Sequence, residues 1–155
     1  MRGVRVMASW VLALFLAVMF LLIADQTLFP PSAAKNVVFP LLAEKSGIAL
    51  WEPTGRFVTG VLDVLTALLL LVWWTRRLGA FLALLIAGGA AALHLSPWLG
   101  TAIPVEFGSA QTDGGQLFNL ALALLAASVL LVVAHPGKKK ARSAHTESGG
   151  AYYAR

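Results

Sequence analysis

Four long hydrophobic segments alternate with shorter polar stretches along the chain. They cover residues 6–24, 57–74, 78–95 and 116–134. Each contains eighteen or nineteen residues, and the interruptions are Asp63 in the second segment and His94 near the end of the third. About 20 apolar residues of helix cross a hydrocarbon core, and peptide groups in lipid must be paired within their own segment. The pattern therefore predicts four transmembrane helices.

Composition narrows the class of protein further. Of the 155 residues, 59% are hydrophobic and 12% charged, and the mean hydropathy is +0.80. A soluble domain has about 45–50% apolar and about 25% charged residues. These values exclude a soluble globular enzyme, a disordered tail and a fibrous repeat, and they leave a small polytopic membrane protein. The chain has no cysteine, which excludes disulfides, thiolate chemistry, iron–sulfur ligation and c-type haem attachment.

Basic residues are distributed unequally between the two sides of the predicted helices. One side carries Arg2, Arg5, Arg76, Arg77, Lys138, Lys139, Lys140, Arg142 and Arg155, and the other carries Lys35, Lys45 and Arg56. The positive-inside rule places the more basic side in the cytoplasm. We therefore predict an all-α fold, a four-transmembrane-helix antiparallel bundle with both termini cytoplasmic, in a bacterial cytoplasmic membrane. The first segment exceeds the 7–15 apolar residues usual in a signal peptide, so we expect an uncleaved helix.

The predicted transmembrane domain covers residues 1–135, with outer loops at 25–56 and 96–115, and a basic cytoplasmic tail follows at 136–155. The hydrophobic first loop predicts a short helix on the membrane surface or over the mouth of the bundle, limited by Pro40. In the tail, Lys138, Lys139, Lys140 and Arg142 predict contact with anionic lipid headgroups, or alternatively with a partner protein. Nucleic-acid binding is not expected so close to a membrane helix.

Small residues at helical spacing predict the faces through which the helices pack. The stripes are Ser9, Ala13, Ala17 and Ala24; Gly79, Ala83, Ala87, Ala90 and His94; and Asn119, Ala123, Ala126 and Leu130. Leu78, Phe81 and Leu85 are expected to face lipid or a partner.

Polar residues within lipid are costly and usually face the interior of a bundle. Asp25, Asp63, His94 and Asn119 all fall in the predicted outer half of the membrane, and the inward stripes predict that they share one polar pocket. In one interpretation this pocket binds a quinone-like headgroup or a proton, with Asp63 and His94 as the titrating pair. In the other, Asp63 bonds to Thr59, Thr66 or His94 and only links helices.

The sequence gives little support for a metal ion, a haem or a nucleotide as a cofactor. One histidine and two aspartates lack metal-ligand spacing on any single element, so no metal is expected. A haem held by two histidines is excluded, because His94 and His135 lie at opposite ends of the predicted membrane domain, about 30 Å apart. Gly88–Gly89 and Gly114–Gly115 lack the Lys-Ser/Thr partner of a nucleotide-binding loop.

Several short motifs resemble those of the DoxX-like family of small four-helix membrane proteins. They are GVLD at 60–63, TRRLGA at 75–80, Gly89–Ala90 with His94, and DGG at 113–115. The resemblance covers about residues 57–133, with Asp63 where the family usually has Glu. It implies a four-helix bundle whose acidic residue in the second helix faces inward, and an association with quinone-linked oxidoreductases. By resemblance, Asp63 and His94 are the positions that matter.

Three functions follow as hypotheses. The first is a non-catalytic accessory subunit that packs against a larger membrane redox or photosynthetic complex, since the chain contains no redox centre or catalytic motif of its own. The second is a quinone-binding subunit of a membrane oxidoreductase, with its site around Asp63 and His94. The third is a small transporter or channel, which the uninterrupted helices disfavour.

Overall fold

Four long helices build the molecule, and the computed structural model describes residues 2–134 of it. They are α1 (Arg2–Leu28), α3 (Thr54–Leu71), α4 (Arg76–His94) and α5 (Gln116–Ala134). All four are long and apolar enough to cross a membrane, so the predicted number of long apolar helices is confirmed. The tail at 136–155, including the predicted lipid-binding cluster Lys138, Lys139, Lys140 and Arg142, lies outside the described residues.

The helix boundaries differ from the predicted ones by a few residues. α1 extends beyond the predicted segment at both ends, whereas α3 begins and ends three residues earlier than expected. Val72 has an extended backbone at the end of α3, so Trp73 and Trp74 belong to the turn rather than to a helix. The turn between α3 and α4 is short and covers residues 72–75.

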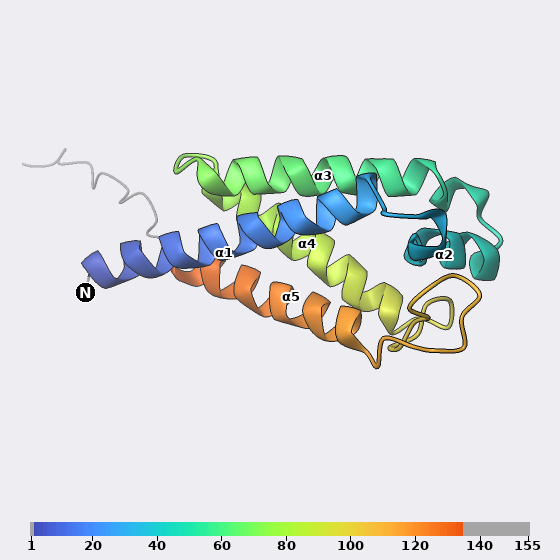
Figure 1. The fold of residues 1–155 in the computed structure, drawn as a ribbon. Helices are drawn as coiled ribbons and strands as arrows, with labels where there is room; N and C mark the ends of the chain where they lie inside the picture. Colours follow the sequence, from blue (N-terminus) through green and yellow to red (C-terminus); the bar gives the residue numbers. More distant parts are fainter. Residues whose placement is uncertain (1, 135–155) are drawn as a thin grey trace, which may run out of the picture.

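The helices form an antiparallel bundle in which α1 packs on α3 and α5, and α4 packs on the same two helices (Figure 1). The beginning of α1 and the α3–α4 turn lie at one end, which we call the turn end. The short helix α2 (Val38–Ser46) lies at the opposite end, the α2 end, with the loop that precedes α5. The fold thus separates Arg5, Arg76 and Arg77 from Lys35, Lys45 and Arg56, as the predicted topology requires.

Alanines and a few large apolar side chains fill the centre of the bundle. The core contains Ala13, Leu16, Ala17, Phe20, Ala67, Leu70, Ala80, Ala83, Ala87, Leu124, Ala127 and Leu131. The predicted inward stripes of α1 and α4 are confirmed, with Ala90 half-buried, and Leu78, Phe81 and Leu85 are exposed as expected. Close helix approach requires these small residues.

The predicted stripe of α5 is wrong. Asn119, Ala123, Ala126 and Leu130 are exposed, and the buried side is formed by Ala121, Leu124, Ala127, Ser128 and Leu131. α5 is apolar on nearly every side, so the spacing of its apolar residues does not distinguish a packed face from an exposed one. Leucines of α5 occupy the core because the alanines of α1 and α4 leave room for them.

A second hydrophobic cluster holds the loops at 25–56 and 96–115 over the α2 end. It contains Val37, Leu41, Leu42, Leu99 and Ile103, from α2 and from the loop between α4 and α5. The expected short helix is therefore confirmed as α2, in which Pro40 occupies the first turn, where its missing N–H breaks no helical hydrogen bond. The short 3-10 turns Ala33–Lys35 and Ala49–Trp51 flank α2.

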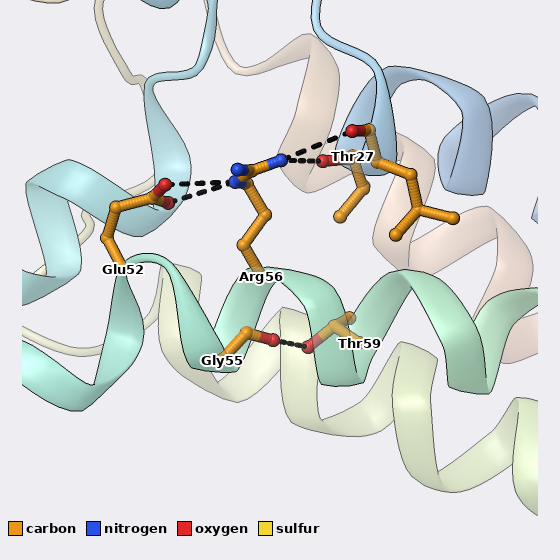
Figure 2. Close-up of polar contacts among 6 residues, drawn as sticks. Thr27, Glu52, Gly55, Arg56 and Thr59 are labelled. Carbon is orange, nitrogen blue, oxygen red and sulfur yellow. Dashed lines mark hydrogen bonds and ion pairs between the residues drawn. The ribbon is translucent and has the colours of Figure 1, made fainter.

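Arg56 joins the end of α1 to the start of α3 (Figure 2). Its Nε donates to Glu52 Oε1 at 3.0 Å, and one of its terminal nitrogens donates to the carbonyl oxygen of Thr27 at 2.9 Å. The carbonyl groups in the last turn of a helix have no partner within the helix. Arg56 supplies one, and this fixes where the chain leaves α1.

Candidate functional site

A cavity of about 170 Å³ lies among the four long helices and below α2. Apolar side chains make most of its walls, among them Phe20 of α1, Phe39 of α2 and Leu124 of α5. The polar part of the lining comes from Thr27, Thr59, Asp63 and His94. A concave, mainly apolar site with a few polar groups is the usual form of a small-molecule site.

Asp63 lines this cavity and is buried within the protein. Its residue is 1% exposed, and within the described chain neither carboxyl oxygen has a hydrogen-bond partner. The hydroxyl of Thr59 donates instead to the carbonyl oxygen of Gly55 at 2.8 Å (Figure 2), and that of Thr66 donates to Leu62 at 2.7 Å. The interpretation of Asp63 as a link to Thr59, Thr66 or His94 is therefore wrong. Nine residues of α3 precede Asp63 and eight follow it, so it lies at the middle of the helix.

His94 also lines the cavity, at the last position of α4, and is 5% exposed. Its Nδ1 lies 2.9 Å from the carbonyl oxygen of Gly100, and its ring contacts Phe118 at a centroid distance of 5.8 Å. A carbonyl oxygen only accepts, so Nδ1 carries the proton in this contact. In a neutral ring, Nε2 is then a hydrogen-bond acceptor.

Asp25 and Asn119 do not belong to the cavity. Both side chains are exposed, and neither contributes to the lining. Asp25 follows the buried Ala24 by one residue and so turns away from the core, and Asn119 lies on the outward face of α5 described above. Of the four residues predicted to share a polar pocket, only Asp63 and His94 line the cavity. The other polar residues of its lining are Thr27 and Thr59.

A second cavity, of about 240 Å³, adjoins the first beneath α2. The two share Val38, Phe39, Thr59, Ile86, Ala90 and His94 in their linings. Trp51 lines the second cavity, and its Nε1 is buried with no hydrogen-bond partner among the described residues. The sequence shows Trp51 merely as an aromatic residue near a predicted helix end. The folding of the loop over α3 and α4 gives it this position, and no local pattern signals that.

The turn end contains a buried charge that sequence reasoning missed. Arg76 is 0% exposed, and its Nε donates to the carbonyl oxygen of Leu70 at 2.9 Å. Its two terminal nitrogens have no hydrogen-bond partner in the part of the chain that is described. The sequence treats Arg76 as one of several cytoplasmic charges, since an arginine beside a predicted span usually faces water.

Asp113 organises the loop that leads into α5. Its carboxylate accepts hydrogen bonds from the backbone N–H groups of Ile103, Gly115 and Leu117, each at 3.0 Å. Partial burial of the carboxyl acts to raise its pKa, but these three donors and the charge of His94 outweigh it, so the pKa of Asp113 lies below its ordinary value. Asp113 is thus a structural residue that closes the loop beside His94.

The cavity offers one carboxyl group, one imidazole ring and two hydroxyl groups among mainly apolar walls. No group of three metal-ligating side chains occurs in the described residues 2–134. The cavity matches a single ring in size, since an engineered apolar cavity of about 150 Å³ binds benzene. The arrangement can hold one ring with a polar substituent at Asp63.

No protein-family model matches the chain, and neither a curated protein nor a solved structure is significantly similar to it.

Proposed function

We propose that the chain is an integral membrane protein with four spans and both termini in the cytoplasm, and that it binds a quinone-like ring in the cavity at Asp63. In this proposal it is a ligand-binding subunit of a membrane oxidoreductase. The redox chemistry belongs to a partner subunit, and this chain supplies the site for the membrane-soluble substrate.

The proposal rests on the carboxyl group of Asp63, which is buried and has no hydrogen-bond partner among the described residues. A buried polar group without a partner costs about 1–3 kcal/mol, and more when it is charged. Asp63 has no partner in the described chain, and an apolar cavity lies beside it. A ligand hydroxyl or carbonyl would satisfy this group, because an ionised carboxylate accepts hydrogen bonds and a protonated carboxyl also donates one.

Two further features support the choice of ligand. The mainly apolar walls favour a ring with an apolar tail over a sugar or a nucleotide. The resemblance to the DoxX-like family implies a link to quinone-dependent oxidoreductases, and Asp63 and His94 are the positions that it marks. The accessory-subunit hypothesis stays a prediction, as does that of a transporter, and both differ from the proposal in expecting no specific site for a quinone.

The binding experiment uses the full chain purified into lipid nanodiscs, with decylubiquinone as the probe. The wild type should bind it saturably. A quinone oxygen only accepts, so its hydrogen bond must come from the protonated carboxyl group of Asp63. Asp63→Leu should therefore weaken binding about threefold to tenfold, since a hydrogen bond between neutral groups contributes about 0.5–1.5 kcal/mol. Asn119→Leu is the matched control, because Asn119 is exposed and outside the cavity. Absence of saturable binding, or equal affinity in Asp63→Leu, would refute the proposal.

The topology is tested separately by single-cysteine labelling, which the cysteine-free chain makes simple. A cysteine at Lys45 should react with an impermeant reagent in intact cells, and a cysteine at Arg77 should react only after lysis. The opposite pattern would invert the topology.

A further inference from the structure

The cavity beneath α2 differs from the one at Asp63 in the polar group that it offers. Asp63 does not contribute to its lining, and Trp51 does. The indole Nε1–H of Trp51 is a hydrogen-bond donor and cannot accept. It is buried, and it has no hydrogen-bond partner among the described residues.

The second cavity also reaches the outer surface of the bundle between α3 and α4. Its lining includes Leu62 of α3 and, from α4, Leu85 and Gly89. Leu85 is 69% exposed, and Gly89 is exposed as well. A Cβ atom placed on Gly89 would meet nothing within 4 Å, so the space beside this glycine is open. If these helices span the membrane, this rim faces lipid.

We propose that the two adjoining cavities form one site for a single lipid-soluble ligand, which enters from the bilayer beside Gly89 and accepts a hydrogen bond from Trp51. This inference rests on the proposed function and specifies the ligand. Trp51 Nε1 and the Asp63 carboxyl group both lack a hydrogen-bond partner in the described part of the chain. The proposed ligand therefore has two separated polar groups, namely an acceptor oxygen for Trp51 and a second oxygen for Asp63. A ring with oxygens at two positions and an apolar tail satisfies both, whereas a fatty acid with one polar end satisfies one of them.

Trp51→Phe tests the acceptor, because phenylalanine keeps an aromatic ring and removes the N–H. With the full chain in nanodiscs, this variant should bind decylubiquinone about threefold to tenfold more weakly, as the loss of one neutral hydrogen bond requires. Affinity for decylbenzene, which has no oxygen, should be the same in the variant and the wild type. Unchanged decylubiquinone affinity, or an equal loss for both probes, would overturn the role of Trp51.

Gly89→Leu tests the entry route. Leucine is a better helix former than glycine and meets no neighbour at Cβ, so this variant should fold while its side chain fills the rim of the cavity. We expect it to slow the association of decylubiquinone at least about fivefold. Ala92→Leu is the control, since Ala92 is exposed on the same helix and lines neither cavity. Equal association rates in the two variants would exclude entry beside Gly89.

These variants separate the two proposals. The proposed function holds and the single site across both cavities is wrong if Asp63→Leu weakens binding, Trp51→Phe leaves the affinity unchanged and Gly89→Leu leaves the association rate unchanged. If the wild type binds no decylubiquinone, both are wrong.

Discussion

The guanidinium carbon of Arg76 lies 3.7 Å from the ring centroid of Trp10, where α4 meets α1 at the turn end. The same group lies 4.9 Å from the ring of Trp73, and the two indole rings are themselves stacked at 6.2 Å. A desolvated cation over a tryptophan face gains about 2 kcal/mol or more. Since no carboxylate pairs with Arg76 in the described chain, these rings and the carbonyl oxygen of Leu70 are what stabilise its burial.

Replacing Arg76 with lysine should therefore be costly although the charge is retained. Lysine has no planar guanidinium to stack on Trp10 and no Nε to donate to Leu70. We expect Arg76→Lys to lower the free energy of unfolding by about 1–3 kcal/mol, measured by thermal or denaturant unfolding in detergent micelles. Arg77→Lys is the control, because Arg77 is exposed and should change stability by less than about 0.5 kcal/mol. Equal effects at the two positions would show that the stacking contributes nothing.

The tight hairpin of α3 and α4 depends on Gly79. A Cβ atom on this residue would lie 2.8 Å from the backbone nitrogen of Leu70 and 2.9 Å from the carbonyl carbon of Leu69. Backbone atoms cannot rotate away as a side chain can, so the helices must separate. Overpacking of this kind costs about 1–3 kcal/mol.

Gly79→Ala should accordingly destabilise the protein despite the better helix propensity of alanine. Gly88→Ala on the same helix is the matched control, since its Cβ would meet only Leu125, at an ordinary 3.7 Å. We expect Gly88→Ala to be neutral or stabilising by up to about 1 kcal/mol. The measurement is the melting temperature of both variants in the same detergent. A Gly79→Ala variant that is more stable than the wild type would mean that α3 and α4 are less tightly packed than described.

The loop before α5 should lose stability in acid. The folded-state pKa of Asp113 lies below its ordinary value of 3.8, so its stabilising effect is full above that value and is lost as the pH falls through the folded pKa. Asp113→Asn should destabilise the loop near neutral pH and converge with the wild type in strong acid. Amide exchange at Ile103, Gly115 and Leu117, the three donors to Asp113, gives the readout. A difference between the proteins that does not change with pH would rule out titration of Asp113 as its cause.

The sequence predicts the four helices well because each needs only an unbroken apolar segment of membrane length. It also predicts the packed faces of α1 and α4, where small residues recur among larger ones. It fails on α5, whose alanines and leucines surround the whole helix, and so it misplaces Asn119. The sequence does not show which distant segments are in contact. For this reason it predicts neither the burial of Arg76 nor the position of Trp51.

For Asp63, the structure contradicts one of the two interpretations that the sequence leaves open. If it linked helices, its replacement by leucine would leave Thr59, Thr66 or His94 without a partner and would destabilise the fold. In the structure these three groups bond to the backbone carbonyl oxygens of Gly55, Leu62 and Gly100 instead. Removing Asp63 therefore leaves no other group unsatisfied within residues 2–134.

Asp63→Leu should thus keep or raise the stability of the ligand-free protein. Leucine is close to aspartate in shape, the adjacent cavity gives it room, and the cost of a buried carboxyl without a partner disappears. The measurement is the melting temperature of both proteins in detergent without added quinone. A loss of more than about 1 kcal/mol in Asp63→Leu would show that the carboxyl group has a partner within the protein. A stable Asp63→Leu protein that binds decylubiquinone weakly would mean that Asp63 serves the ligand and not the fold.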